Sequence, residues 1–211
     1  RFSGTWKDFV FSFKDLKILK AISNISMYSG YYRAVRDFLQ PVLQTFALSL
    51  PIMLAFDKEQ RSSVIVGLVY FIIFLLTSFT SRKSGNFAGR FRYVSMPLNL
   101  TLIAGLAVGL ISGLFYNFQW LIPAIIFYII IYLVENLRKP LGMGYITDLL
   151  QKNILATVLS AESQTKTIFA AVIAPLLGLF ADMFGIGTGL LIVSGMLLLI
   201  APFLLARKQP D

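Results

Sequence analysis

The sequence of 211 residues contains no cysteine and no histidine. Without cysteine the chain can form no disulfide, and without histidine it lacks the commonest metal ligand and the usual proton shuttle near neutral pH. An enzyme that works inside a membrane needs a nucleophile with its base, or a set of metal ligands. The sequence also places no paired aspartates on one apolar segment. We therefore predict no enzymatic activity, no metal and no cofactor.

Charged residues are also scarce, at 14% of the sequence, whereas soluble domains carry about a quarter. Hydrophobic residues make up 57%, and the mean hydropathy is +0.76. Long runs carry no charge at all, as at 62–81, 94–120 and 183–206. About 18 apolar residues suffice for a helix to span a bilayer, where only helices and closed barrels satisfy every backbone group. Because these runs lack the alternation of barrel strands, they predict an all-α membrane protein.

The apolar runs predict six transmembrane helices, at roughly 21–46, 62–81, 94–116, 118–137, 157–181 and 186–206. The chain then divides into a leading segment at 1–20, a helical region at 21–206 and a short tail at 207–211. Within the third span, glycines recur every fourth residue, at Gly105, Gly109 and Gly113. This spacing predicts a flat groove for close packing of another helix.

The positive charges predict the orientation of these spans. If the N-terminus is cytoplasmic, fourteen of the 19 cations lie on the inner side: Arg1, Lys7, Lys14, Lys17, Lys20, Arg82, Lys83, Arg90, Arg92, Arg138, Lys139, Lys152, Arg207 and Lys208. Only Lys58 and Arg61 then lie outside. Cytoplasmic loops are enriched in Lys and Arg, so we predict an integral protein of the plasma (inner) membrane with both termini in the cytoplasm. The net charge of +9 follows from these loops, and we predict no nucleic-acid partner.

The leading segment at 1–20 is predicted to be amphipathic and to lie on the cytoplasmic surface of the bilayer. Apolar side chains recur there at helical spacing, at Trp6, Phe9, Phe13 and Leu16, with lysines between them. Such a segment places its rings at the acyl boundary and its cations toward anionic lipid. It is either the end of an interdomain linker or a simple lead-in to the first span. Because the sequence opens with Arg1 rather than Met, we expect a fragment or a processed product.

The first predicted span carries three charged residues, Arg33, Arg36 and Asp37. An ionisable group inside a span costs about 2.5–3.5 kcal/mol on the insertion scale, which makes each one a candidate functional residue. Arg33 and Asp37 are four residues apart and can pair along one helix face, leaving Arg36 unpaired. Tyr28 and Tyr32 are close enough in sequence to line the same region.

This charged cluster allows two interpretations. It either lines a water-filled cavity or lies at the outer interface, where its arginines snorkel to lipid headgroups. The apolar run at 38–56 continues well beyond the charges and favours the cavity. Pro41 removes a helical hydrogen bond, so we also expect a kink just outside the cluster. The surplus cation suggests an anionic or amphipathic solute, unless Arg36 pairs with an acid elsewhere.

Two further charged groups are candidate gates or ion pairs. Glu162 and Lys166 in the fifth span are four residues apart, with the acid first, and are either a structural pair or an inner gate that breaks and reforms. Glu135 ends the fourth predicted span, and Arg138 and Lys139 follow three and four residues later. This group is interpreted as an ion cluster at a helix end, with a gate as the alternative.

Part of the sequence resembles the major facilitator superfamily of transporters. The run Glu-Asn-Leu-Arg-Lys-Pro-Leu at 135–141, Tyr-Ile-Thr-Asp at 145–148 and Ala-Thr-Val-Leu-Ser at 156–160 is similar to the loop between that family's tenth and eleventh helices. Residues 174–182 are similar to the end of the eleventh helix, and Ser-Arg-Lys-Ser-Gly at 81–85 occupies the place of a basic loop. Leu155 stands where the family usually has Arg, and the basic loop lacks the family's Asp.

The resemblance implies that the chain is the C-terminal six-helix half of a twelve-helix secondary transporter. It implies alternating access around a central site near the midplane, lined by the first span with Arg33, Arg36 and Asp37. The partners would be the bilayer, an N-terminal six-helix half, a small-molecule solute and, as a candidate coupling ion, the proton. The acids that could carry a proton are Asp37, Glu135 and Glu162. Two alternatives stay open: a self-contained six-helix channel or carrier that works as an oligomer, and a non-transporting sensor remnant of the fold.

Overall fold

The computed structural model describes residues 16–51, 57–149 and 155–206, and every regular element in these ranges is a helix. The elements are α2 (Leu16–Arg36), α3 (Leu39–Ser49), α4 (Lys58–Arg82), α5 (Ser84–Ala88), α6 (Ser95–Asn117), α7 (Leu121–Leu149), α8 (Leu155–Phe184), α9 (Ile186–Ile200) and the 3₁₀ turn η1 (Ala201–Leu204). The prediction of an all-α chain is confirmed. Residues 1–15 of the leading segment predicted at 1–20 and the tail at 207–211 lie outside the described residues, and residues 16–20 form the start of α2.

Five of these elements are long and apolar enough to cross a membrane: α4, α6, α7, α8, and α9 with η1. They coincide with the last five of the six predicted spans. The first predicted span is divided into α2 and α3, and neither is among the five. The chain is therefore a membrane protein by length and composition of its helices, as predicted, with five candidate spans in the described residues.

The break between α2 and α3 lies at Asp37 and Phe38. A proline has no backbone N–H, so Pro41 cannot bond to the carbonyl of Asp37, and its ring disfavours a continuous helix at that point. The kink therefore falls within the charged cluster instead of beyond it. Two tyrosine hydroxyls of α7 satisfy carbonyls at the end of α2: Tyr128 donates to the Val35 oxygen and Tyr132 to the Arg36 oxygen at 3.0 Å.

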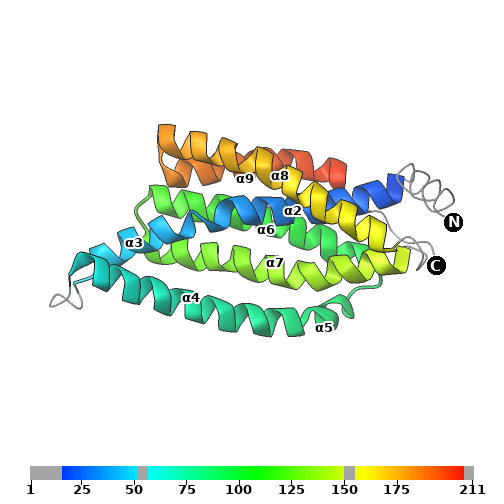
Figure 1. Cartoon of the computed structure of the whole chain (residues 1–211), viewed down its shortest axis with the longest axis horizontal. Coiled ribbons are helices and arrows are strands. Elements are labelled where there is room, and N and C mark those ends of the chain that lie inside the picture. Colours follow the sequence, from blue (N-terminus) through cyan, green and yellow to red (C-terminus); the bar gives the residue numbers. More distant parts are fainter. Residues whose placement is uncertain (1–15, 52–56, 150–154, 207–211) are drawn as a thin grey trace.

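The long helices lie side by side along the long axis of the molecule (Figure 1). α4 lies at one edge, α8 and α9 at the other, and α2, α6 and α7 between them (Figure 1). α2 packs mainly on α8 and α7, and α6 packs on α7 and α9. The start of α2 lies beside η1, where the Asn24 amide donates to the Leu204 carbonyl at 3.0 Å. The two ends of the described chain thus lie at the same end of the bundle.

The predicted glycine groove on α6 is confirmed as a packing surface. Gly105 lies against the ring of Tyr28, and Gly109 lies against the hydroxyl of Tyr31. Gly113 lies against the backbone of α9 at Gly187. Any larger residue at these three positions would meet α2 or α9. The groove thereby fixes both neighbours on one face of α6.

The outer surface of the bundle is apolar. Phe71, Phe74 and Phe79 on α4 and Ile168 on α8 are all more than 60% exposed, and so is Leu199 on α9. In water such a surface would favour aggregation, whereas in a bilayer lipid tails cover it. The same helices bury few positions: in α8, only Val158, Ile173 and Leu177 are buried. These exposures agree with the composition in indicating a membrane environment.

Candidate functional site

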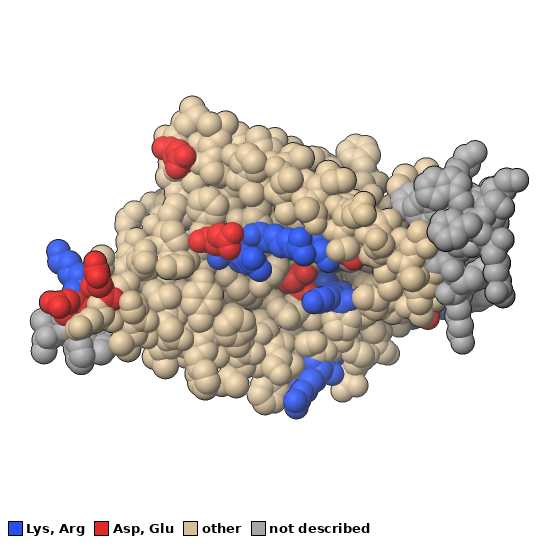
Figure 2. All heavy atoms as spheres, in the orientation of Figure 1, with Lys and Arg blue, Asp and Glu red and all other residues tan. Residues whose placement is uncertain are grey.

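A cavity of about 250 Å³ opens to the surface between α2, α7 and α8, and its lining is rich in charged residues, of which Arg33, Arg36 and Lys139 are exposed. Its lining comprises four cations, two acids, two polar side chains and five apolar or glycine residues: Arg33, Arg36, Lys139, Lys166, Glu135, Glu162, Ser29, Tyr32, Ile25, Gly142, Met143, Ile146 and Leu159. In Figure 2 blue and red atoms gather in a strip across the middle of the visible face, and further charged side chains lie toward its edges. We call this cavity the central crevice.

Each helix presents one face to the central crevice. On α2 the lining residues are three or four positions apart: Tyr32 and Arg33 follow Ser29 by three and four positions, and Arg36 follows them by four and three. On α7 and α8 the lining residues recur at similar intervals, as with Leu159, Glu162 and Lys166 on α8. Residues spaced in this way share one side of an α-helix. The crevice is therefore built by three helices that each turn a polar stripe toward the other two.

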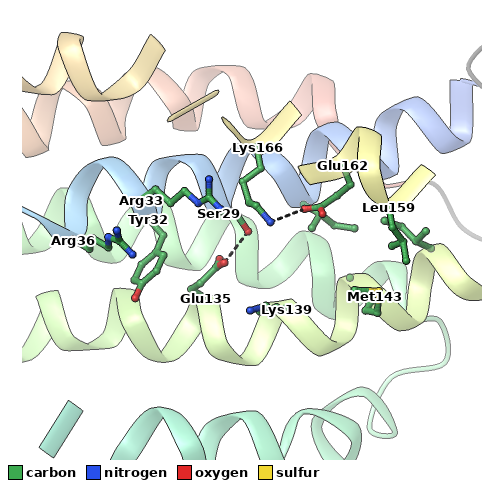
Figure 3. A pocket seen from close by; sticks show the side chains of 13 residues that line it. Ser29, Tyr32, Arg33, Arg36, Glu135, Lys139, Met143, Leu159, Glu162 and Lys166 are labelled. Carbon is green, nitrogen blue, oxygen red and sulfur yellow. Dashed lines mark hydrogen bonds and ion pairs between the residues drawn. The ribbon is translucent and has the colours of Figure 1, made fainter. Parts of the chain in front are cut away.

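The predicted pair on α8 is confirmed. The Nζ atom of Lys166 lies 3.7 Å from Oε1 of Glu162, and their side chains are 18% and 12% exposed. Figure 3 shows Lys166 reaching from α8 across to the space between α2 and α7. The pair lies in the crevice, at the boundary between its charged and apolar parts. A partly buried pair of this kind can break if a ligand offers either partner a better contact.

Glu135 lies in the middle of α7 with its side chain turned into the crevice (Figure 3). Its Oε1 accepts a hydrogen bond of 2.7 Å from the hydroxyl of Ser29 on α2. Its Oε2 is buried and has no hydrogen-bond partner among the described residues. A buried carboxylate oxygen without a donor is costly, which makes Glu135 a candidate for binding a ligand or a proton.

The interpretation of Glu135 and Arg138 as a helix-end ion cluster is wrong. α7 continues through Pro140 to Leu149, so residues 135–149 are helical where the sequence suggested a loop. Arg138 is 2% exposed and turned away from the crevice, toward α2 and α6. Its guanidinium donates to Oδ1 of Asn24 at 2.9 Å and to Oγ1 of Thr101 at 2.8 Å, and it also bonds the Asn24 and Leu98 carbonyls.

Arg138 is therefore held by hydrogen bonds to α2 and α6 and does not line the crevice. Its guanidinium also lies over the ring of Tyr28, 5.0 Å from the ring centroid. Tyr28, a predicted site residue, is fully buried, and its hydroxyl donates to the Ile131 carbonyl at 3.3 Å. Because Tyr28 fills the groove of α6, it lies outside the crevice. Tyr32, by contrast, lines the crevice and packs edge-on against Tyr132 with 5.0 Å between ring centroids.

The predicted pairing in α2 is also wrong. Asp37 pairs with Arg36, its neighbour in sequence, with 3.2 Å between Nε and Oδ1, and both side chains are more than half exposed. Asp37 lies in the helix break, which takes it off the face of α2 that carries Arg33. Asp37 does not line the crevice. Arg33 instead donates to Oγ1 of Thr167 on α8 at 3.3 Å, and it has no carboxylate partner in the described ranges.

The structure thus brings together Tyr32, Arg33, Arg36, Glu135, Glu162 and Lys166 from the predicted site, and it leaves out Tyr28, Asp37 and Arg138. It adds Ser29, Lys139 and the apolar residues at one end of the crevice. Helical spacing could have found Lys139 and Met143, because they lie four and eight residues after Glu135. This prediction would have depended on α7 continuing as a helix beyond Pro140.

The chemistry open to the crevice is electrostatic. Within the described residues no group of three or more acidic side chains is arranged to hold a metal ion. The lining can attract a charged solute, orient it by hydrogen bonds from Ser29 or Tyr32, and exchange protons at a carboxylate. Comparisons of the chain with protein-family models, with curated proteins and with solved structures return no match, so the crevice is interpreted from its own geometry.

Proposed function

We propose that this chain is one six-helix half of a secondary transporter of the major facilitator type, moving a small solute by alternating access. In this proposal α2 and α3 together form the first crossing, and α4, α6, α7, α8 and α9 supply the other five. The observation that carries the proposal is the central crevice, where four cations and two acids line a cavity between three helices of an otherwise apolar bundle.

The cost of these charges supports a functional role. Each ionisable group inside a span costs about 2.5–3.5 kcal/mol on the insertion scale, and simulations give more. Several such groups persist together only where water, ion pairs or a ligand solvate them. Structural pairing accounts for Lys166 with Glu162 and for Arg36 with Asp37. The remaining charges favour a solvated pathway over interfacial anchoring.

The break between α2 and α3 supports the same proposal. Transporters commonly place substrate and coupling-ion sites beside discontinuous helices. Here the break falls at Asp37, one residue after Arg36, which lines the crevice. A break allows α3 to tilt while α2 stays packed on α8 and α7. That motion would change access to the crevice from one end of the bundle.

Among the three acids considered for coupling, Glu135 has the most suitable surroundings. Asp37 is exposed and paired, and Glu162 is paired with Lys166. Glu135 is 8% exposed, with one oxygen bonded to Ser29 and the other without a donor among the described residues. Its charge state is therefore sensitive to what enters the crevice. We assign Glu135 as the proton-carrying group of the proposed transporter.

The proposed setting is the plasma membrane, with both termini in the cytoplasm. Both ends of the described chain lie at the same end of the bundle, which an even number of crossings requires (Figure 1). The loop after α4 carries Arg82, Lys83, Arg90 and Arg92, and cytoplasmic loops are enriched in such residues. The opposite end of α4 carries Lys58 with Glu59 beside it.

The test uses single cysteines, since the natural chain has none. Arg33→Cys and Lys139→Cys are made in the intact protein that carries this chain, reconstituted in vesicles and challenged with a membrane-impermeant maleimide from each side. Lys58→Cys, outside the crevice, calibrates full exposure. Alternating access predicts that positions 33 and 139 react from one side at a time and that imposing a proton gradient changes the side.

Two other outcomes would overturn the proposal. Labelling at positions 33 and 139 from both sides at once would indicate a channel. Labelling from neither side, while position 58 reacts, would make the crevice a buried ion network without transport.

A further inference from the structure

The central crevice carries positive charge that its own acids do not neutralise. Lys166 pairs with Glu162 and Arg36 pairs with Asp37. Arg33 has only the neutral hydroxyl of Thr167 as a partner. Lys139 makes no hydrogen bond or ion pair with any residue that the structure describes. Two cations therefore face one cavity without a bonded carboxylate.

The two unneutralised cations come from different walls of the crevice. Arg33 extends from α2 and Lys139 from α7, with Glu135 and Ser29 between these helices (Figure 3). A guanidinium offers a planar fork that binds two oxygens of one anion, while an ammonium acts as a compact point charge. An anionic head with two or more oxygens could contact both. Such a head would connect α2 to α7 and α8.

The other end of the crevice is apolar. Ile25 on α2, Met143 and Ile146 on α7 and Leu159 on α8 line it. In Figure 3, Leu159 and Met143 lie at the end away from Arg36 and Tyr32. Methionine adapts to ligands of different shape because its side chain is unbranched and polarizable. This end is suited to a short apolar body joined to a charged head.

We infer that the central crevice binds a small amphipathic organic anion, with its anionic head held by Arg33 and Lys139 and its apolar body against Met143, Ile146 and Leu159. This inference rests on the proposed function in naming that transporter's substrate class. The cavity of about 250 Å³ limits the ligand to a small molecule. A solute cation is disfavoured because the lining carries four cations against two acids.

The same chemistry, an anionic head with an apolar body, also occurs in anionic membrane lipids. A cavity of this volume can hold only the headgroup and the first methylene groups of a lipid with two acyl chains. A free organic anion can enter whole. The experiment therefore distinguishes the two sources.

The experiment measures binding of hexanoate to the purified intact protein that carries this chain, in nanodiscs of neutral phosphatidylcholine, by isothermal titration calorimetry against empty discs. Hexylammonium, of equal length and opposite charge, and succinate, without an apolar end, serve as comparison probes. The variants are Arg33→Gln and Lys139→Gln, with Arg33→Lys as a charge-preserving variant. Arg82→Gln, at the exposed end of α4, is the matched control.

The inference predicts that hexanoate binds while hexylammonium does not, and that succinate binds more weakly than hexanoate. Arg33→Gln and Lys139→Gln should each weaken hexanoate binding about tenfold, as expected for loss of a charged hydrogen bond. Arg82→Gln should bind as the natural chain does, and Arg33→Lys should retain most of the affinity. Circular dichroism and thermal unfolding of each variant establish that it is folded.

Equal binding by both charge types, or hexanoate binding unchanged in the two crevice variants, would overturn the inference. Loss of hexanoate binding when phosphatidylglycerol is added to the discs would assign the crevice to a lipid headgroup and also overturn it. Flux of hexanoate in proteoliposomes of the intact protein is measured separately. If hexanoate binds but is not transported, the proposed transport function is rejected and the anion site is supported. If another solute is transported and hexanoate does not bind, the transport function is supported and the anion site is rejected.

Discussion

Glu135 and Arg138 are less than one turn apart on α7, and their surroundings differ completely. Arg138 has its donors satisfied by side chains and carbonyls of α2 and α6. Glu135 has one oxygen bonded to Ser29 and one without a donor among the described residues. At the scale of the single residue, a satisfied buried charge indicates structure, whereas an incompletely satisfied one indicates exchange.

The proposed proton exchange at Glu135 leads to a prediction about pH. An anion in the crevice is repelled by ionised Glu135 and not by its neutral form, so hexanoate affinity should rise as the pH falls. Glu135→Gln is always neutral and keeps the contact with Ser29. It should bind hexanoate about tenfold more tightly at pH 7, a typical coupling between two sites, with no dependence on pH. Calorimetric titrations at several pH values measure both.

Other charged or titratable groups lie on the helices around Glu135 and must be kept constant in that comparison. They are Tyr28, Tyr32, Arg33 and Arg36 of α2, Arg138 and Lys139 of α7, and Glu162 and Lys166 of α8. Glu162→Gln is the control, because that acid is already paired with Lys166. If Glu135→Gln retained the natural pH dependence and Glu162→Gln lost it, the proton would belong to Glu162.

The satisfied charge of Arg138 leads to a prediction about stability. Arg138→Leu removes four hydrogen bonds and leaves Asn24 and Thr101 without their donor inside the bundle. We expect the free energy of unfolding to fall by about 3 kcal/mol, since each unsatisfied buried group costs about 1–3 kcal/mol. Lys139→Leu, at the next position but exposed, should change it by less than about 0.5 kcal/mol. Reversible unfolding in mixed micelles measures both, and equal losses would contradict the assignment.

At the scale of the helix, the contact between α2 and α8 depends on a glycine. A Cβ atom added at Gly30 would lie 2.5 Å from Cβ of Phe169 and 2.9 Å from the backbone nitrogen of Ala170. Backbone atoms cannot move aside as a flexible side chain can, so the two helices would have to separate. Since α2 and α8 form two walls of the central crevice, this contact also sets the width of the crevice.

Gly30→Ala should therefore lower the free energy of unfolding by about 1–3 kcal/mol, as overpacking commonly does. The matched variant is Gly144→Ala on α7, where an added Cβ meets nothing within 4 Å. Because alanine favours a helix, that variant should be neutral or gain up to about 1 kcal/mol. Unfolding of the two variants in the same detergent gives the comparison. If Gly30→Ala increased the stability, α8 would not pack against Gly30 of α2.

The sequence predicted helices better than it predicted their contacts. The apolar runs predicted six spans, because burial in lipid requires long apolar segments, and five of the six are confirmed as helices long and apolar enough to cross a membrane. The effect of each proline on its helix was harder to predict. The helix that contains Pro41 is interrupted at Asp37, whereas α7 continues through Pro140. A proline removes one hydrogen bond in either case, and packing by neighbouring helices decides whether the helix survives.

The same limit explains the errors in the candidate site. Spacing along one helix correctly paired Glu162 with Lys166, because both lie on one face of an unbroken helix. It wrongly paired Arg33 with Asp37, because the break moves Asp37 off that face. Contacts between helices, such as Ser29 with Glu135, have no periodic signature in a single sequence.

At the scale of the whole molecule, cations and length together predict how the bundle lies in the membrane. α4 has 25 residues, which gives a length of about 37 Å and is enough to cross a hydrocarbon layer of about 30 Å. Its two ends should therefore lie on opposite sides. The end with Arg82 and Lys83 should face the cytoplasm.

Lys58→Cys and Lys83→Cys test this orientation. In intact cells an impermeant maleimide should label position 58 and leave position 83 unlabelled, and permeabilising the cells should make position 83 reactive. The reverse pattern would invert the topology. Labelling of both positions in intact cells would show that α4 does not cross the membrane.

The position of α2 in the bundle has a consequence for how the protein is made. α2 is not among the helices apolar enough to cross a membrane alone. Some of its polar side chains form hydrogen bonds with residues that come much later in the sequence. Ser29 bonds Glu135, 106 residues further on, and Ser26 bonds the Glu162 carbonyl, 136 residues further on. A ribosome will have released α2 long before those partners exist. We expect α2 to wait beside the insertion machinery and to enter the bilayer only when α7 and α8 arrive.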